Sequence, residues 1–210
     1  MVKNNRIQTL AELTKGYHTV LDIGTDHGLV LLEAFKKNFI QTAIASDIRE
    51  KPLNQARRNL EGYPVSFVLS DGFLQINQPF DLAIISGMGA RLIRKILTHA
   101  PKDKTFVLQA NDKHEELRRF LNDHHFEIID ERVIFDQFYY VIIIVKYGKM
   151  DLTETDLYLG PILRTKPEAK SYYEFKRRQY ETILPKVSGT RKKQIEKIIN
   201  FFKQETNTST

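Results

Sequence analysis

The stretch Val20-Leu-Asp-Ile-Gly-Thr-Asp-His-Gly28 decides how this chain folds. Apolar residues lead into Asp22 and Gly24, and an apolar, helix-forming segment follows Gly28. Glycine adopts backbone conformations that other residues avoid, so it suits a sharp turn where the backbone approaches a ligand. The stretch therefore predicts a buried strand over 18–23, a tight turn, and a helix over 27–38.

A second apolar run, 42–47, ends in Asp47, 23 residues after Gly24. In nucleotide-binding α/β folds, an acidic residue about 20 residues past the glycine turn binds ribose hydroxyls. The spacing Gly24-x-x-x-Gly28 differs from the Gly-x-Gly-x-x-Gly that approaches a pyrophosphate. The pattern favours a nucleoside ligand without a pyrophosphate, and S-adenosylmethionine is the leading candidate.

Strand and helix signals alternate over the first 150 residues, which is typical of a mostly parallel sheet. Further strands are predicted over 65–71, 81–85 and 105–108, and a helical segment follows each of the first five strands except 65–71. Asp112 and Glu115 have the spacing of a capping box for the helix that ends near residue 125. Residues 127–135 and 138–147 are separated by two residues and predict an antiparallel hairpin that closes a seven-stranded sheet.

An acidic residue ends each of the first three predicted strands: Asp22, Asp47 and Asp71. Seven strands with this arrangement form the plan of a class I, Rossmann-like methyltransferase. In that plan Asp22 orients the amino-acid portion of the cofactor, Asp47 accepts hydrogen bonds from the ribose, and Asp71 accepts one from the adenine amine. The alternative is that these acids are ordinary strand ends of an α/β protein.

The last 60 residues differ in character. Gly160-Pro161 predicts a linker, and helical segments over about 167–184 and 191–204 predict a basic, coiled-coil-like α-helical hairpin. We therefore expect two domains, 1–150 and 151–210. The formal net charge is +6, and residues 151–210 hold twelve Lys and Arg against eight Asp and Glu. This excess favours a polyanionic partner.

Composition excludes several classes of protein. The chain has no cysteine, so disulfides, thiolate metal sites and thiol nucleophiles are excluded and a reducing cytoplasm is favoured. Its longest apolar run, Tyr139 to Val145, is too short to cross a bilayer. The first residues lead into no long apolar segment, so a signal peptide is not expected.

Four motifs together resemble the TrmK family: Asp22-Ile-Gly-Thr-Asp-His27, Ile85-Ser-Gly-Met-Gly89, Gln109-Ala-Asn111 and Gly160-Pro161. Members of this family methylate N1 of adenosine 22 of bacterial tRNA with S-adenosylmethionine, and they carry a C-terminal helical appendage. The resemblance implies a cytoplasmic tRNA methyltransferase. Ala90 departs from the family pattern, which has a second glycine there, and Ala110 replaces a proline.

Asp26 and Asn111 are the candidate catalytic residues. Methylation of a ring nitrogen creates a cation, and the Asp26 carboxylate would stabilise it; the alternative is a helix N-cap. Asn111 would hold the base edge through its amide, or it only starts a loop. The candidate cofactor-binding residues are Asp22, Gly24, Thr25, His27, Gly28, Asp47, Ile48, Asp71, Gly72, Gly87 and Met88. For His27 a structural hydrogen bond, and for Met88 a packing role, are the alternatives.

Clusters of cations are the candidate contacts to RNA: Arg6, Arg91, Arg94, Lys95, Lys176, Arg177, Arg178, Arg191, Lys192 and Lys193. Solvated helix faces are the alternative for each cluster. The aromatic residues among them, Tyr172, Tyr173, Phe175 and Tyr180, favour packing over base stacking. No metal site is expected, because His114, His124 and His125 have the positions of helix-surface residues.

Three functions remain open at this point. The first is the tRNA adenine-N1 methyltransferase, acting as a monomer without a membrane or metal partner. The second is a methyltransferase of another RNA or of a small molecule. The third is a non-catalytic RNA-binding module on the same fold.

Overall fold

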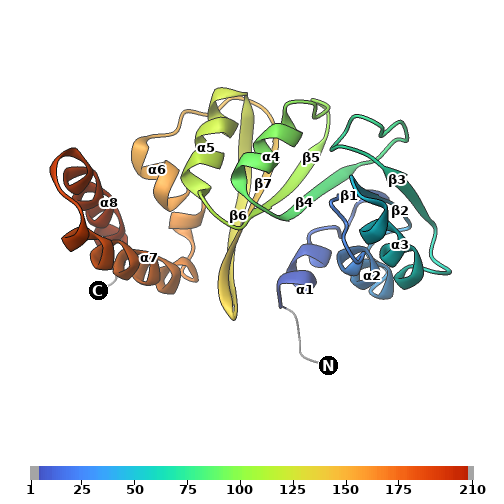
Figure 1. Ribbon diagram of the computed structural model, residues 1–210, viewed down its shortest axis with the longest axis horizontal. Coiled ribbons are helices and arrows are strands. Elements are labelled where there is room, and N and C mark those ends of the chain that lie inside the picture. The colour runs from blue at the N-terminus through green and yellow to red at the C-terminus, as the bar shows by residue number, and fades with distance from the viewer. Residues whose placement is uncertain (1–4, 208–210) are drawn as a thin grey trace.

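The structure, a computed structural model, describes residues 5–207 (Figure 1). Its strands are β1 (Thr19–Ile23), β2 (Thr42–Asp47), β3 (Val65–Leu69), β4 (Leu82–Met88), β5 (Thr105–Ala110), β6 (Phe126–Asp136) and β7 (Phe138–Tyr147). Its α-helices are α1 (Asn5–Glu12), α2 (Leu29–Lys36), α3 (Glu50–Asn59), α4 (Ala90–Leu97), α5 (His114–Asp123), α6 (Glu154–Leu159), α7 (Ala169–Ile183) and α8 (Gly189–Asn207). Short 3-10 turns, η1 (Leu163–Thr165) and η2 (Leu184–Lys186), precede α7 and α8.

Within these residues seven strands form one sheet in the order β3-β2-β1-β4-β5-β7-β6. The pairs from β3 to β5 are parallel, whereas β7 runs antiparallel to both β5 and β6. The chain builds outward from β1 to β3 and then returns to place β4 on the other side of β1. This reversal creates a crevice at the carboxyl ends of β1 and β4, where open α/β sheets bind ligands.

Both faces of the sheet are covered. Apolar residues of α1, α2 and α3 pack on one face, as Leu10, Leu31 and Ala56 show. Residues of α4 and α5 pack on the other, including Ile93 and Leu117. The central strands β1 and β2 are buried along almost their whole length, and β4 is buried from Leu82 to Ile85, which explains their continuous apolar runs. The predicted seven-stranded, mostly parallel α/β fold is confirmed.

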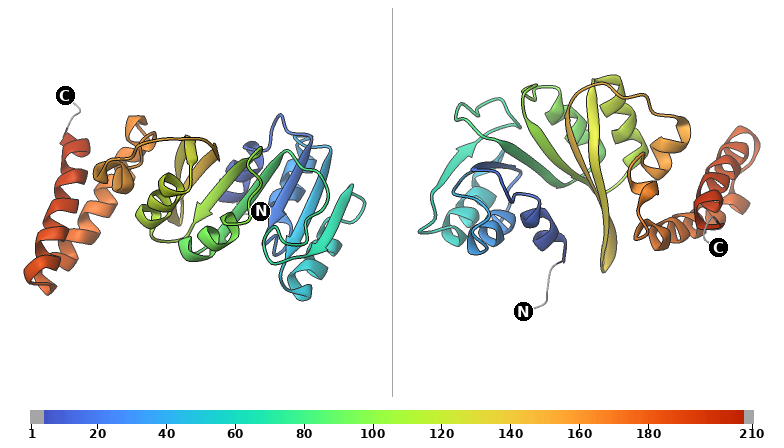
Figure 2. Two further views of the ribbon diagram at one scale, coloured as in Figure 1. Left: turned by 90° about the horizontal axis from the view of Figure 1, so that it is seen from above. Right: turned by 180° about the vertical axis from the view of Figure 1, so that it is seen from behind.

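The C-terminal helices α7 and α8 lie side by side at one end of an elongated molecule (Figure 2), so the predicted helical hairpin is confirmed. Buried apolar residues along α8, such as Ile198 and Phe202, join the same core cluster as α4 and α5. None of the helices within residues 5–207 combines the length and hydrophobicity that a bilayer crossing requires.

The connection at Gly160 is packed rather than a free linker. Arg118 of α5 and Glu131 of β6 form a fully buried ion pair, with Nε and Oε1 2.8 Å apart. Arg118 also donates to the carbonyl of Leu157, and Glu131 accepts from the backbone N–H groups of Ile162 and Leu163. A Cβ on Gly160, whose φ is +88°, would lie 2.5 Å from the Glu131 carboxylate. Neither this pair nor α6 was predicted from the sequence.

The predicted capping box at α5 is wrong. Lys113 precedes this helix in a left-handed conformation and makes no side-chain cap. Asp112 instead accepts a hydrogen bond from the backbone N–H of Ala90, at the start of α4 (2.9 Å). A carboxylate at a helix start is favourable for either helix. The fold brings the start of α4 within its reach, 22 residues away in the chain.

Candidate active site

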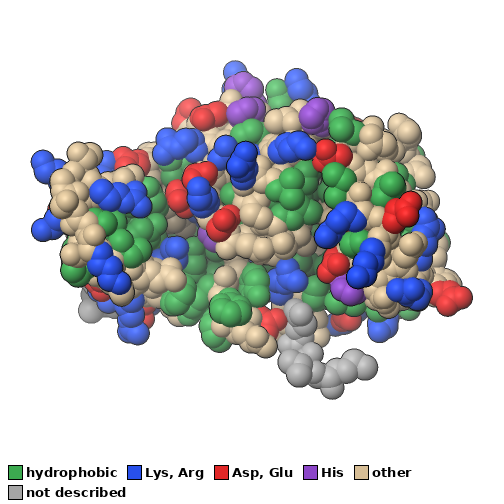
Figure 3. Space-filling model, viewed as in Figure 1, with side chains coloured by type: hydrophobic (Ala, Val, Ile, Leu, Met, Phe, Trp, Pro, Cys, Tyr) green, Lys and Arg blue, Asp and Glu red, His purple; other side chains and the backbone are tan. Residues whose placement is uncertain are grey.

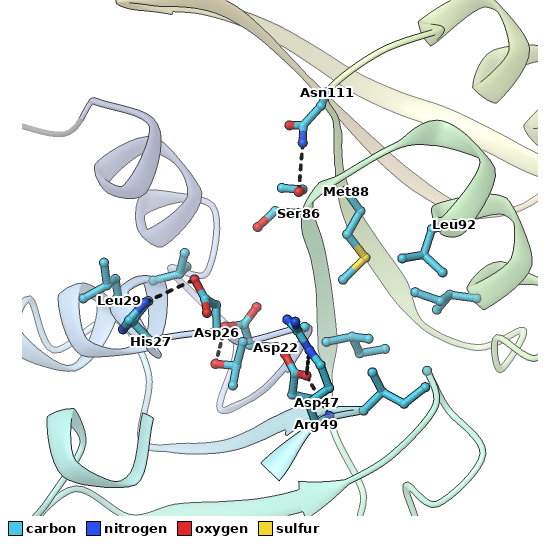
Figure 4. A pocket seen from close by; sticks show the side chains of 18 of the residues that line it. Asp22, Asp26, His27, Leu29, Asp47, Arg49, Ser86, Met88, Leu92 and Asn111 are labelled. Atoms are coloured by element: carbon cyan, nitrogen blue, oxygen red, sulfur yellow. Dashed lines mark hydrogen bonds and ion pairs between the residues drawn. The ribbon is translucent and has the colours of Figure 1, made fainter. Parts of the chain in front are cut away.

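A cleft of about 680 Å³ opens at the carboxyl ends of β1, β2 and β4 (Figure 4). Most of the predicted cofactor-binding residues line it, together with both candidate catalytic residues: Asp22, Gly24, Thr25, Asp26, His27, Asp47, Ile48, Asp71, Gly72, Gly87, Met88 and Asn111. Gly28 is not among the lining residues. A Cβ on Gly28 would lie 2.7 Å from Leu60, so this glycine lets the start of α2 approach the end of α3.

The turn after β1 is fixed by its backbone. The N–H groups of Gly24 and Thr25 both donate to the carbonyl of Ser46 in β2, at 2.8 and 2.9 Å. Gly24 has a φ of +74°, and a Cβ there would lie 2.0 Å from the terminal methyl of Met88. Only glycine fits this position without displacing Met88 from the opposite wall of the cleft.

Asp22 is a buried carboxyl at the floor of the cleft. Burial raises its pKa from 3.8 to about 6, and the hydrogen bond from the Thr25 hydroxyl (2.7 Å) opposes this rise. The nearby Asp47 carboxylate raises the pKa of Asp22 further, and Arg6 lowers it. A buried anion without a full counter-charge is costly, so a positive charge placed beside Asp22 would favour its ionised form.

The other two strand-end acids differ in their surroundings. Asp47 is buried, and its Oδ1 accepts from the backbone N–H of Arg49 at 2.9 Å. A carboxylate has about four lone-pair sites, so Asp47 retains acceptor capacity for ligand hydroxyls. Asp71 is half-buried, and its Oδ2 accepts from Lys95 of α4 at 2.9 Å.

Asp26 lies at the rim of the cleft with its side chain 66% exposed. Its φ is +48°, and its Oδ2 lies 3.5 Å from Nε2 of His27. Gly28 is the N-cap of α2, and no side chain caps this helix, so the N-cap interpretation of Asp26 is wrong. A non-glycine residue with positive φ is uncommon and often marks a functional position.

Gln109, a fully buried residue of β5, organises the opposite wall of the cleft. Its Oε1 accepts from the Arg6 guanidinium (3.0 Å) and from the N–H of Gly87 (3.1 Å). Its Nε2 donates to the carbonyl of Ala110 and to Oδ1 of Asn111 (3.0 Å). Asn111 in turn donates to the carbonyl of Gly87 at 2.8 Å. The bulge at Ser86–Met88 and the Asn111 amide are therefore fixed by one side chain.

Sequence reasoning missed Gln109 as a site residue. A polar residue inside the apolar run 105–110 was the signal that marks such a group. It also missed Tyr140, whose ring lies 5.4 Å below the Arg6 guanidinium and which lines the cleft. Arg6, predicted as an RNA contact, lies within the cleft itself.

The remaining predicted RNA contacts lie outside the cleft. Arg91 of α4 is exposed, whereas Arg94 pairs with Glu116 (3.0 Å) and Lys95 with Asp71. On α7, burial lowers the pKa of Lys176, and Arg177 lies near Glu181. Of the cations predicted on this hairpin, Arg178 on α7 and Arg191, Lys192 and Lys193 on α8 are exposed. Tyr172 and Tyr173 are buried, in agreement with packing.

Within residues 5–207 no group of three or more His, Asp or Glu side chains has the arrangement of a metal site. The expectation that His114 lies on the helix surface is wrong. Its side chain is half-buried, its Nε2 lies 3.1 Å from the carbonyl of Ala110, and burial lowers its pKa to about 3.

Comparison with known proteins identifies relatives along nearly the whole chain. A relative in Mycoplasma pneumoniae, whose name places it provisionally among tRNA methyltransferases, is 35% identical over 172 residues, 75% of this chain and 79% of that protein. The tRNA (adenine(22)-N(1))-methyltransferase of Bacillus subtilis (strain 168) is 28% identical over 183 residues, 79% of this chain and 76% of that protein.

Solved structures agree. The structure of M. capricolum TrmK in complex with S-adenosyl-homocysteine superimposes with a TM-score of 0.84 at 25% identity, covering 99% of each chain. A protein of the NADB-Rossmann superfamily from Streptococcus agalactiae has a TM-score of 0.88 at 25% identity, covering 99% of this chain and 98% of that one. The model of the family described as TrmK, tRNA (adenine(22)-N(1))-methyltransferase, matches residues 20–208, and this chain belongs to that family.

Proposed function

We propose that this protein binds S-adenosylmethionine in the β1–β4 cleft and transfers its methyl group to N1 of adenosine 22 of tRNA. The observation that carries the proposal is the pair of buried carboxylates, Asp22 and Asp47, beside the Gly24 turn in a 680 Å³ cleft. The M. capricolum relative holds the demethylated cofactor, S-adenosyl-homocysteine.

The residues of the cleft fit this cofactor. Asp22 meets its cationic amino-acid portion, and Asp47 accepts from its ribose hydroxyls. Ile48, which is 60% exposed, offers an apolar surface to the adenine ring. Asp71 accepts from the adenine amine while it shares its charge with Lys95. Gly24, Gly72 and Gly87, all with positive φ, let the backbone approach the ligand.

Alignment is the main catalytic device in this proposal. When bound, S-adenosylmethionine supplies an electrophilic methyl group. Adenine N1 already carries an in-plane lone pair, so no base has to deprotonate it first. Asn111, oriented by Gln109, holds the edge of the base. Asp26, at the rim, stabilises the positive charge that the ring gains and accepts a proton from N6 afterwards.

The tRNA is proposed to lie across the cleft and the basic C-terminal helices. Arg6 supplies positive charge inside the cleft, and Arg91 lies on the exposed side of α4. Figure 3 shows Lys and Arg side chains at the end of the molecule that α7 and α8 form, and in this proposal the exposed ones contact the phosphate backbone. In this proposal residues 1–150 form the catalytic domain and 151–210 a tRNA-binding domain, and the enzyme acts as a monomer, without a metal ion, in the cytoplasm where tRNA is processed.

An assay with an unmodified tRNA transcript tests the proposal. Purified full-length protein, S-adenosylmethionine and the transcript should yield 1-methyladenosine on nucleoside analysis. Calorimetry with S-adenosylmethionine alone separates the alternatives. Binding of the cofactor without methylation of the transcript would point to another substrate. Absence of cofactor binding would leave only a non-catalytic RNA-binding module.

A further inference from the structure

The tip of the β6–β7 hairpin projects beyond the edge of the sheet at which the cleft opens. β5 pairs with β7 only as far as Ala110, which lies opposite Val141. Residues 138–140 of β7 pair with β6 alone. Figures 1 and 2 show the hairpin projecting between α1 and α7. The tip therefore lies beside the mouth of the cleft, where the RNA of the proposed reaction has to enter.

The two faces of this tip have different surroundings. Tyr139 and Phe135 lie on one face, with ring centroids 5.0 Å apart, and the Tyr139 ring also contacts Phe175 of α7 (5.2 Å). Side chains alternate along a strand, so Phe138 shares the other face with Tyr140, which lines the cleft. Phe138 lies two residues beyond Tyr140, about 7 Å further from the cleft, and it is 69% exposed.

The charged groups around Phe138 indicate that a base, and not a phosphate, of the RNA contacts this ring. Asp136, its partner on β6, accepts a hydrogen bond from the backbone N–H of Arg6 (3.3 Å), and this carboxylate repels phosphate. The Arg6 guanidinium lies on the cleft side, over Tyr140. Figure 3 shows hydrophobic side chains gathered at the tip of the hairpin. An uncharged, flat group fits this place, with the phosphates directed toward the flanking cations.

We propose that Phe138 is a stacking platform for a base next to the target adenosine in the bound tRNA. The inference rests on the proposed function and adds a contact for the RNA. An adenine that enters the cleft has to leave its stack, and this costs free energy. An aromatic ring beside the cleft restores stacking to the neighbouring base and so offsets part of that cost.

Full-length variants of Phe138 test the inference. Phe138→Ala and Phe138→Leu should each raise the KM and the Kd for tRNA about tenfold, because a base–aromatic contact contributes an affinity of that order. Phe138→Tyr should stay near the wild type, since it keeps the ring. The Kd for S-adenosylmethionine and the melting temperature should not change in any variant, because the ring is exposed and outside the cleft.

Phe135→Ala is the matched control: it removes a ring that is 60% exposed at the same tip but on the opposite face. It should leave tRNA affinity unchanged. Wild-type tRNA affinity in Phe138→Ala would overturn the inference. Wild-type tRNA affinity in Phe138→Leu would also overturn it, because an apolar side chain without an aromatic ring would then be sufficient. Loss of self-association instead of tRNA affinity would assign the ring to an interface between copies and also overturn it. Failure of the wild type to methylate tRNA would refute the proposed function instead, because Kd is measured without catalysis.

Discussion

Replacing Asp22 by Asn is expected to stabilise the ligand-free protein while it weakens cofactor binding. Burial raises the pKa of Asp22 from 3.8 to about 6. Each tenfold change in proton affinity corresponds to about 1.4 kcal/mol, so the ionised carboxylate costs the folded state about 3 kcal/mol at neutral pH. An Asn side chain keeps an oxygen for the Thr25 hydroxyl and removes the buried charge. The variant should therefore gain up to about 3 kcal/mol in free energy of unfolding at pH 8.

The gain should depend on pH in one direction. The folded state takes up a proton at Asp22 near pH 6, whereas the unfolded state does so near 3.8. As the pH falls from 6 to 4, Asp22 becomes protonated in the folded wild type, so the free energy of unfolding of the wild type rises. The Asn variant carries no charge at this position and shows no such rise. The difference between the two proteins should be largest above pH 6 and vanish near pH 4. Urea unfolding of both proteins at pH 8, 6 and 5 measures it.

Calorimetry on the same two proteins supplies the functional half of this prediction. The affinity of the wild type for S-adenosylmethionine should fall about tenfold per pH unit below pH 6, because the cation binds the ionised form. The variant should bind more weakly at pH 8 and show a flat profile. A variant that is less stable than wild type at pH 8, or that binds the cofactor equally well, would refute the role assigned to the Asp22 charge.

Four further predictions follow from the structure. Asp47→Ala should weaken S-adenosylmethionine binding about 100-fold in calorimetry, because two charge-assisted hydrogen bonds are lost; unchanged affinity would remove Asp47 from the site. Asp26→Asn should lower kcat about tenfold with little change in cofactor Kd, since water screens this exposed charge; a larger change in Kd than in kcat would make the residue structural. Replacing all three cations of Arg191–Lys193 by Gln should reduce the salt dependence of tRNA binding, as the slope of log K against log salt, by about 2 to 3; an identical slope would exclude phosphate contacts there. Arg118→Ala should cost about 3–5 kcal/mol in urea unfolding, because Glu131 stays buried without its partner; a loss below about 1 kcal/mol would contradict that burial.

The sequence determines much of the fold through local patterns. The apolar runs of β1, β2 and β4 are long enough to need cover on both faces, and glycines mark the turns at their ends. Because the carboxyl ends of parallel strands share one edge, acids 22, 47 and 71 were expected near one another, and all three line the cleft. The hairpin of β6 and β7 follows from two β-rich segments that the sequence places two residues apart. In the structure β6 extends to Asp136, so that Gln137 alone separates the two strands.

Contacts between residues far apart in the chain could not be predicted from the sequence. The spacing of Asp112 and Glu115 predicted a local capping box, but the fold places the backbone N–H of Ala90, at the start of α4, within hydrogen-bond distance of Asp112. Gln109 holds Arg6 of α1, and no periodicity relates residues 103 positions apart. For the same reason, the buried ion pair of Arg118 and Glu131 could not be predicted from local sequence patterns. Because the stretch from Leu157 to Leu163 satisfies this pair, removing the C-terminal segment would also expose it, so charge variants test tRNA binding better than truncation.

The most direct test of the proposed reaction locates the methyl group on the RNA. A tRNA transcript incubated with the enzyme and S-adenosylmethionine is digested and sequenced by mass spectrometry, beside a transcript in which adenosine 22 is replaced by guanosine. One 1-methyladenosine is expected at position 22 of the first transcript, and none in the second. A methyl group at another position, or equal methylation of both transcripts, would contradict it.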